Sequence, residues 1–337
     1  MTAHVTTQGI GNPGDTRSTN GAATQQEVDA ARAPLDALRA QVSRVYLGPA
    51  RTVDLLLIAL LGRGHALLEG VPGVAKTTLV KTYATALGCS VRRVQFTPDL
   101  LPSDITGTYV LSPKEGTFSL RAGPIFANVV LADEINRAPA KTQAALLEAM
   151  QERQVTIEGD RFELPAPFIV LATQNPVDLE GTYPLPEAQI DRFLLHIPMT
   201  YPSPKDEVEM LRSHGGGTPH VGPVLDPARV VELQNLTTRI HVEDDVLDYV
   251  VALTTFTRKH PRVVLGASPR ASLALLTAAR GLCILKGRTF VTPDDIREAA
   301  GPALAHRLVL VPELEGDHKA RTGVIEEGVN RVPYRRG

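Results

Sequence analysis

The sequence predicts an α/β fold, in which helices cover both faces of a parallel sheet and a smaller all-α domain follows. Three observations support this. A glycine-rich turn at residues 70–78 stands between an apolar, strand-like run and a helix-like segment. Apolar runs at residues 129–132 and 168–172 have the uninterrupted hydrophobicity of strands buried on both faces. Beyond residue 224 the chain shows helical patterns and helix-start signals.

A tail, two helices and a strand are expected before the glycine-rich turn. Residues 1–24 are rich in Thr, Gly, Asn and Gln without apolar periodicity, a composition typical of disorder. From Gln25 onward, apolar residues recur at helical spacing: Val28, Ala31, Leu35, Leu38 and Val42. A second helix carries the apolar run at 53–61, and residues 65–68 form a short buried strand.

The glycine-rich turn has the sequence of residue types that a phosphate-binding loop requires: glycines, then a lysine and a hydroxyl residue, between a strand and a helix. It reads Gly70-Val71-Pro72-Gly73-Val74-Ala75-Lys76-Thr77-Thr78. In such a loop, successive backbone N–H groups and the N-terminus of the next helix bind phosphates. Lys76 would reach the β- and γ-phosphates of a nucleotide, and the Thr77 hydroxyl would hold Mg²⁺. Ala75 stands where glycine is usual, and we expect its methyl group to fit only if φ is negative.

Two carboxylates, Asp133 and Glu134, directly follow the apolar run at 129–132. Open parallel sheets bind their ligands at the carboxyl ends of the strands. Asp133 would hold Mg²⁺, largely through water, and Glu134 would polarise the water that attacks the γ-phosphate. At this distance after a phosphate-binding loop, the pair indicates nucleotide hydrolysis.

Three further polar residues each allow two interpretations. Asn175 stands just beyond the strand at 168–173, where it would orient the attacking water or simply begin a turn before proline. Arg192 is either a surface charge paired with Asp191 or a finger that reaches a neighbouring chain's γ-phosphate. Arg270 lies in the first turn of a helix, where the dipole disfavours a cation. It is either simply exposed or faces an anion such as the γ-phosphate.

The remaining elements complete two domains. We expect a strand at 91–96, hairpins at 108–121 and 155–164 and a helix at 141–153 in the first, and helices at 227–236, 244–258, 269–285 and 293–306 in the second. Prolines and a glycine triplet mark the junction. We therefore place the nucleotide-binding domain at 25–204, a linker at 205–223, the all-helical domain at 224–320 and a tail at 321–337.

Composition excludes several classes of protein. A length of 337 residues is enough for two domains, and a net charge of −2 gives no overall electrostatic case for nucleic acid. Cys89 and Cys283 are far apart and the histidines are scattered, so neither a disulfide framework nor a metal cluster is expected. The longest apolar run, at 55–61, is too short to span a bilayer, and the N-terminus lacks a signal pattern. We expect a cytoplasmic protein.

The chain resembles the MoxR family of AAA+ ATPases, within the clade that carries an insertion in helix 2. The matching segments follow one another in family order between residues 45 and 307. They are residues 68–73, 103–107, 132–139, 147–152, 172–176, 185–193 and 267–271.

This resemblance implies a P-loop NTPase-type fold with an all-α lid, and ATP and Mg²⁺ as cofactors. It makes residues 70–77 the Walker A loop and Asp133 with Glu134 the Walker B pair. Asn175 becomes sensor 1, Arg192 the arginine finger that acts on the neighbouring subunit, and Arg270 sensor 2.

The resemblance also implies that Val45 and Tyr46 line the adenine pocket and that the two hairpins are the helix-2 and pre-sensor-1 insertions. Proteins of this family form hexameric rings and remodel partners, often von Willebrand factor A-domain proteins. Three alternatives stay open: the ATPase subunit of a metal chelatase, a nucleic-acid-directed motor, and a nucleotide-gated binding module with negligible hydrolysis. The segment at 133–139 favours MoxR over the chelatases.

Overall fold

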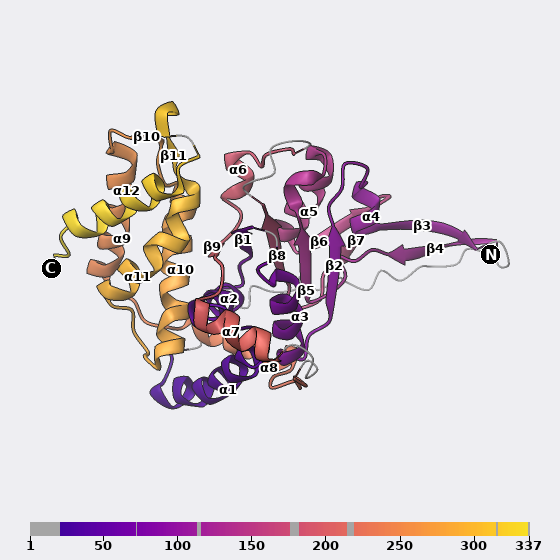
Figure 1. Cartoon of the computed structure of the whole chain (residues 1–337), viewed down its shortest axis with the longest axis horizontal. Helices are drawn as coiled ribbons and strands as arrows, with labels where there is room; N and C mark the ends of the chain where they lie inside the picture. The colour runs from indigo at the N-terminus through magenta and orange to yellow at the C-terminus, as the bar shows by residue number, and fades with distance from the viewer. Residues whose placement is uncertain are drawn as a thin grey trace, which may run out of the picture.

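The computed structural model describes residues 21–71, 73–112, 116–175, 182–213, 219–314 and 316–335. An α/β domain and a mainly helical domain lie side by side in it (Figure 1). Several of our expectations fall outside the described residues: most of the tail at 1–24, Pro72 of the phosphate-binding loop and the glycine triplet of the linker.

The sheet of the first domain has five parallel strands. In spatial order they are β2 (Val91–Gln95), β5 (Val129–Asp133), β8 (Ile169–Gln174), β1 (Ala66–Gly70) and β9 (Leu195–Met199). The apolar runs predicted as strands form β1, β5 and β8, the three inner strands. The edge strand β9 was not predicted, because His196 and Pro198 interrupt its apolar pattern. Proline is tolerated there since an edge strand pairs on one side only.

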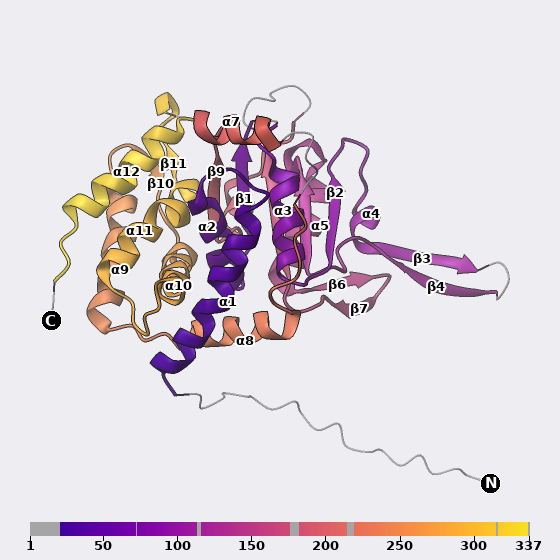
Figure 2. The ribbon, with the colours of Figure 1, turned by 60° about the horizontal axis from the view of Figure 1, so that its bottom comes forward.

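Two cores form on the two faces of the sheet, because successive strand residues point to opposite sides. Leu68 and Leu171 pack on one face, and Leu67 and Val170 on the other. The first face is covered by α1 (Gln25–Ser43), α2 (Ala50–Leu61) and α3 (Lys76–Ala86), and the second by α5 (Ala140–Glu152). Figure 2 shows α1 and α3 in front of the sheet. The predicted arrangement, with helices on both faces, is confirmed.

The first helix begins where a capping box satisfies its free N–H groups. The Thr24 side chain accepts from the backbone of Glu27, and the Glu27 side chain accepts from the Thr24 N–H. The apolar residues predicted for this helix are all buried: Val28, Ala31, Leu35, Leu38 and Val42. The residues just before Gln25 are also part of the fold, since Ala23 is buried and its N–H donates to the carbonyl of Arg239.

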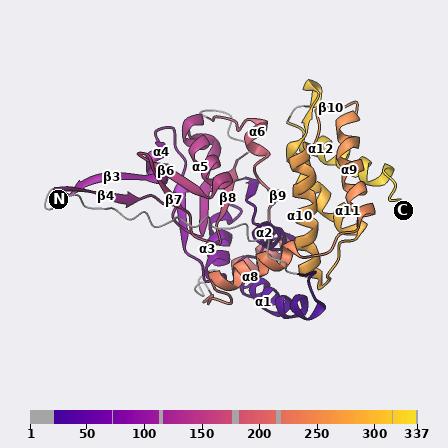
Figure 3. The same ribbon diagram turned by 180° about the vertical axis from the view of Figure 1, so that it is seen from behind.

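Both predicted hairpins are present and project from the end of the α/β domain that lies away from the helical domain (Figure 3). They are β3 (Gly107–Ser112) with β4 (Thr117–Ala122), and β6 (Gln154–Ile157) with β7 (Asp160–Glu163). The Tyr109 hydroxyl donates to Asp160 at 2.6 Å and so connects them. A short helix, α4 (Pro102–Thr106), precedes the first hairpin.

The second domain contains helices in the predicted positions. They are α8 (Pro227–Thr238), α9 (Asp244–Lys259), α10 (Pro269–Lys286) and α11 (Pro293–Leu304), and α7 (Pro204–Ser213) precedes them. Two expectations were wrong in detail. A small antiparallel pair, β10 (Val263–Leu265) with β11 (Val309–Leu310), interrupts the helices. A further helix, α12 (His318–Arg331), occupies much of the expected tail, because Asp317 caps it and Val324 and Ile325 are buried.

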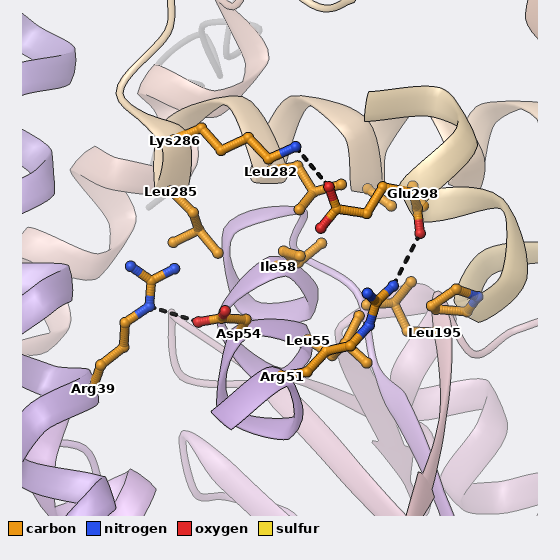
Figure 4. Close-up of a pocket in the computed structure, with 13 residues that line it drawn as sticks. Arg39, Arg51, Asp54, Leu55, Ile58, Leu195, Leu282, Leu285, Lys286 and Glu298 are labelled. Atoms are coloured by element: carbon orange, nitrogen blue, oxygen red, sulfur yellow. Dashed lines mark hydrogen bonds and ion pairs between the residues drawn. The ribbon is translucent and has the colours of Figure 1, made fainter. Parts of the chain in front are cut away.

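The two domains share a core in which α2 and β9 meet α10 and α11. Figure 4 shows the small cavity at this joint, with Arg51 bonded to the carbonyl of Glu298 at 3.2 Å. The Lys286 ammonium pairs with the Glu298 carboxylate at 2.6 Å. The contacts fix the helical domain against the edge of the sheet. Among the described residues, no helix combines the length and apolar content needed to cross a bilayer.

Candidate active site

The glycine-rich turn connects the carboxyl end of β1 to the first residue of α3, as a phosphate-binding loop requires. The Lys76 ammonium lies at the start of α3 and donates to the carbonyl of Gly70 at 2.6 Å. Burial lowers the pKa of Lys76, and the charges of Asp133, Glu134 and Glu69 partly offset that effect. The loop lysine and the Walker-B-like carboxylates therefore share one electrostatic environment.

Ala75 departs from our expectation. Its backbone has φ +58° and ψ +27°, which is the left-handed region, so the prediction of a negative φ was wrong. The residue is exposed, so its methyl group meets little steric resistance from the surroundings. What it retains is the intrinsic strain of an L-residue in this conformation, on the order of 1 kcal/mol.

Replacing Ala75 by glycine is expected to keep nucleotide binding and leave the unfolding free energy unchanged or up to about 1 kcal/mol higher. Glycine removes the left-handed strain but adds entropy to the unfolded chain, and the two effects partly cancel. Thermal unfolding of both proteins measures the difference. A loss of more than about 1 kcal/mol would contradict the left-handed conformation.

Asp133 ends β5 with both carboxylate oxygens oriented by hydrogen bonds. Thr173 of the adjacent strand donates its hydroxyl to one oxygen at 2.6 Å, and Arg93 of β2 donates to the other at 2.7 and 2.9 Å. The carboxylate is mostly buried. Oxygen donors alone, the Asp133 carboxylate and the Thr77 hydroxyl, are the ligand set that suits Mg²⁺.

Glu134 has a left-handed backbone, with φ +58°, which turns its side chain away from the direction of β5. Its N–H donates to the Thr173 hydroxyl at 2.8 Å. The side chain of Gln95 donates to its carboxylate at 2.8 Å, and Arg137, in the one-turn helix η1 (Ile135–Arg137), pairs with it at 3.2 Å. The carboxylate is thus held at the carboxyl edge of the sheet.

Asn175 follows β8 at the same edge and is buried. Lys76, Asp133, Glu134 and Asn175 therefore all stand at the carboxyl ends of three neighbouring strands, as predicted. Val45 and Tyr46 follow α1. Tyr46 is buried, and burial raises the pKa of its hydroxyl.

Arg192 and Arg270 lie at the opposite edge of the sheet. Both line a surface depression formed with Gly62, Gly64 and His65, the residues that lead into β1. Parallel strands of five residues place this amino edge about 15 Å from the carboxyl edge. The two arginines are therefore brought together with each other and not with the phosphate-binding loop of their own chain.

Of the two interpretations of Arg192, pairing with Asp191 is not what the structure shows. Asp191 pairs with Arg307, at 2.7 Å. Within the described part of the chain, no ion pair involves Arg192 or Arg270. Arg270 is exposed and Arg192 half-buried. The two cations thus line one surface depression together, and neither has a partner carboxylate among the residues that the structure describes.

The supporting residues Arg93, Gln95 and Thr173 were missed from the sequence, as was a cluster at the joint between the domains. There the Glu69 carboxylate accepts from His196 at 2.6 Å and from His318 at 3.0 Å. Burial by itself would raise the pKa of Glu69, but the hydrogen bonds from the two histidines outweigh that effect and lower the pKa to about 2. The scattered histidines thus do gather, contrary to our expectation, and attach α12 to the strand that leads into the loop.

Comparisons with known proteins agree with this geometry. The model of the ATPase family associated with various cellular activities (AAA) matches residues 65–195, and that of the AAA lid domain matches residues 255–327. Chaperone MoxR1 of Mycobacterium tuberculosis is 46% identical over 301 residues, 87% of this chain and 80% of that protein. Protein MoxR of Paracoccus denitrificans is 34% identical, covering 83% of this chain and 90% of that protein. A crystal structure from Cytophaga hutchinsonii superposes with a TM-score of 0.85 at 38% identity, over 93% of this chain and 98% of that one.

Proposed function

This chain belongs to the MoxR family of AAA+ ATPases, and from that premise we propose that it hydrolyses ATP in a ring and uses the energy to remodel partner proteins. The observation that carries the proposal is the gathering of Lys76, Asp133, Glu134 and Asn175 at one edge of the sheet. A binding module with negligible hydrolysis would not need Glu134 oriented by three hydrogen-bonding groups.

Each residue of the edge has a distinct role in the proposed reaction. The backbone of the loop and the Lys76 ammonium bind the phosphates. Thr77 and Asp133 would hold Mg²⁺, which supplies charge neutralisation at the phosphate oxygens when bound. Glu134 accepts a proton from the attacking water, and Asn175 orients that water. We assign the adenine pocket to Val45 and Tyr46 by family resemblance.

The opposite face would complete the site of a neighbour. The amino-edge position of Arg192 supports its assignment as a finger acting on the next subunit, since it cannot reach its own loop across the sheet. Arg270 lies beside it, so we infer that it acts in the same direction, rather than over the γ-phosphate of its own chain. A ring, as in the hexamers of the family, would align the two faces.

The client is proposed from the family alone. Many members act on von Willebrand factor A-domain proteins, and we propose a partner of that class and a cytoplasmic location. A metal-chelatase subunit is disfavoured because the MoxR relatives match over more than four-fifths of this chain. A nucleic-acid motor is disfavoured by the net charge of −2.

Replacing Lys76 by alanine tests the nucleotide site. ATP affinity should fall below detection or by a large factor, because the phosphates lose the cation that the loop places beside them. Calorimetry with Mg-ATP measures it, and steady-state phosphate release should disappear as well. Lys81→Ala is the matched control, since Lys81 is exposed on the same helix. Unchanged affinity in Lys76→Ala would contradict the assignment of this loop.

A further inference from the structure

The lid residue Arg307 is almost completely buried against the segment that carries Arg192. It lies in the one-turn helix η2 (Ala305–Arg307), and its side chain is only 3% exposed. Its Nε donates to the Asp191 carboxylate at 2.7 Å, and Nη2 donates to the carbonyls of Asp191 and Phe193 at 3.1 and 2.7 Å. The guanidinium thus holds the residues on either side of Arg192.

The same segment receives further contacts from the lid. Nη1 of Arg307 donates to the carbonyl of Leu194 at 3.3 Å, and the ring of His306 contacts the carbonyl of Phe193 at 3.1 Å. Backbone carbonyls at 191, 193 and 194 are therefore satisfied by two consecutive lid residues. A planar guanidinium suits this task, because its donors diverge in a fixed geometry.

Asp191 connects this segment to the second arginine. Its other carboxylate oxygen accepts from the Ser268 hydroxyl at 3.2 Å. Ser268 is the N-cap of α10, the helix that carries Arg270 in its first turn. The Asp191 carboxylate thus bonds to two residues of the lid, Arg307 and Ser268, and Asp191 is the residue directly before Arg192 in the chain.

We propose that Arg307, through Asp191, is a positioning residue that sets Arg192 and Arg270 as one unit on the face presented to the next subunit. Arg307 would not contact phosphate itself, because its side chain is almost completely buried. Its role is to hold the segment 191–194 in a fixed position relative to the start of α10, so that the guanidinium groups of Arg192 and Arg270 reach the neighbouring subunit together. This inference rests on the proposed function, in which those two arginines act on a neighbour's ATP.

The proposal predicts a specific defect in Arg307→Lys and in Asp191→Asn. Lysine keeps the charge but cannot make the divergent bonds, and asparagine keeps the shape but leaves the buried guanidinium without its carboxylate. Turnover should fall about 10- to 100-fold, as for a misplaced catalytic group. ATP affinity should stay within about threefold of the original, because the variant's own pocket lies at the other edge.

Mixed rings separate positioning from general damage. Arg307→Lys should regain activity when mixed with Lys76→Ala, whose pocket is inactive and whose arginines are intact. It should gain no activity when mixed with Arg192→Ala, because no chain in that mixture supplies a correctly placed finger. Arg288→Lys is the matched control and should retain full turnover, because Arg288 also pairs with a buried carboxylate, Asp295, but only within the lid.

Three results would overturn the proposal: full turnover in both Arg307→Lys and Asp191→Asn, a joint loss of ATP affinity and turnover, or co-assembled rings with Lys76→Ala that stay inactive. If Arg307→Lys does not fold, Asp191→Asn supplies the same readouts. Failure of the proposed function is distinguishable from these. If the proposed function fails, Arg192→Ala keeps normal turnover, and this holds whatever the turnover of Arg307→Lys is.

Discussion

A chain in which glutamine replaces Glu134 is expected to bind ATP normally and to hydrolyse it more slowly by about 10²-fold or more. Glutamine preserves the shape of the side chain but cannot accept a proton from water, and loss of a general base has this scale. The phosphate-binding loop and Asp133 are untouched by the change. The variant should therefore accumulate with ATP bound.

Single-turnover phosphate release and nucleotide retention on a sizing column measure the two effects separately. Glu232→Gln is the control for removing an acid, since Glu232 is exposed on α8 and pairs only with Arg229 among the described residues. Turnover near the original rate in Glu134→Gln would move the proton-accepting role to another residue.

Local sequence patterns were sufficient to predict where the central residues of the candidate site, Lys76 and Asp133, lie in the fold. A phosphate-binding loop is defined by contiguous residues, and the carboxylates at 133 and 134 follow directly on a run that a parallel sheet must bury. For this reason, the positions of Lys76 and Asp133 could be predicted from one stretch of sequence each.

The partners that orient these groups could not be predicted in the same way. Thr173 and Arg93 lie about 40 residues from Asp133 on either side along the chain and reach it only because β8 and β2 flank β5. Strand order in a sheet is set by tertiary packing, so no local pattern reveals it. The contact between Asp191 and Arg307 is of the same kind, since it joins residues from two domains.

Backbone strain and edge elements were also beyond local patterns. Nothing in the residue type of Ala75 requires a positive φ, and the loop imposes it. The edge strand β9 contains a proline and a histidine, and α12 has few apolar residues, so neither shows a clear period. Both are stabilised by packing against neighbours instead.

Replacing Arg192 by alanine is expected to slow ATP hydrolysis strongly while leaving ATP binding in place. In phosphoryl transfer, charge develops on the γ-phosphate oxygens, and an arginine finger contributes about 10³- to 10⁵-fold. Lys76, Asp133 and Glu134 supply one side of that site. The other side needs a cation that the same chain keeps at the far edge of its sheet. Arg192→Ala should thus bind ATP nearly as well as the original protein in calorimetry and hydrolyse it poorly.

The direction of this effect is tested in mixed rings. A Lys76→Ala chain has an inactive pocket and an intact finger, whereas an Arg192→Ala chain has a sound pocket and no finger. In rings assembled at random from equal amounts, about a quarter of the interfaces would join the sound pocket to the intact finger, because each interface is heterologous. Phosphate release should reappear although each parent is inactive. If co-assembly is demonstrated and the mixture stays as inactive as its parents, Arg192 does not act on the neighbouring subunit.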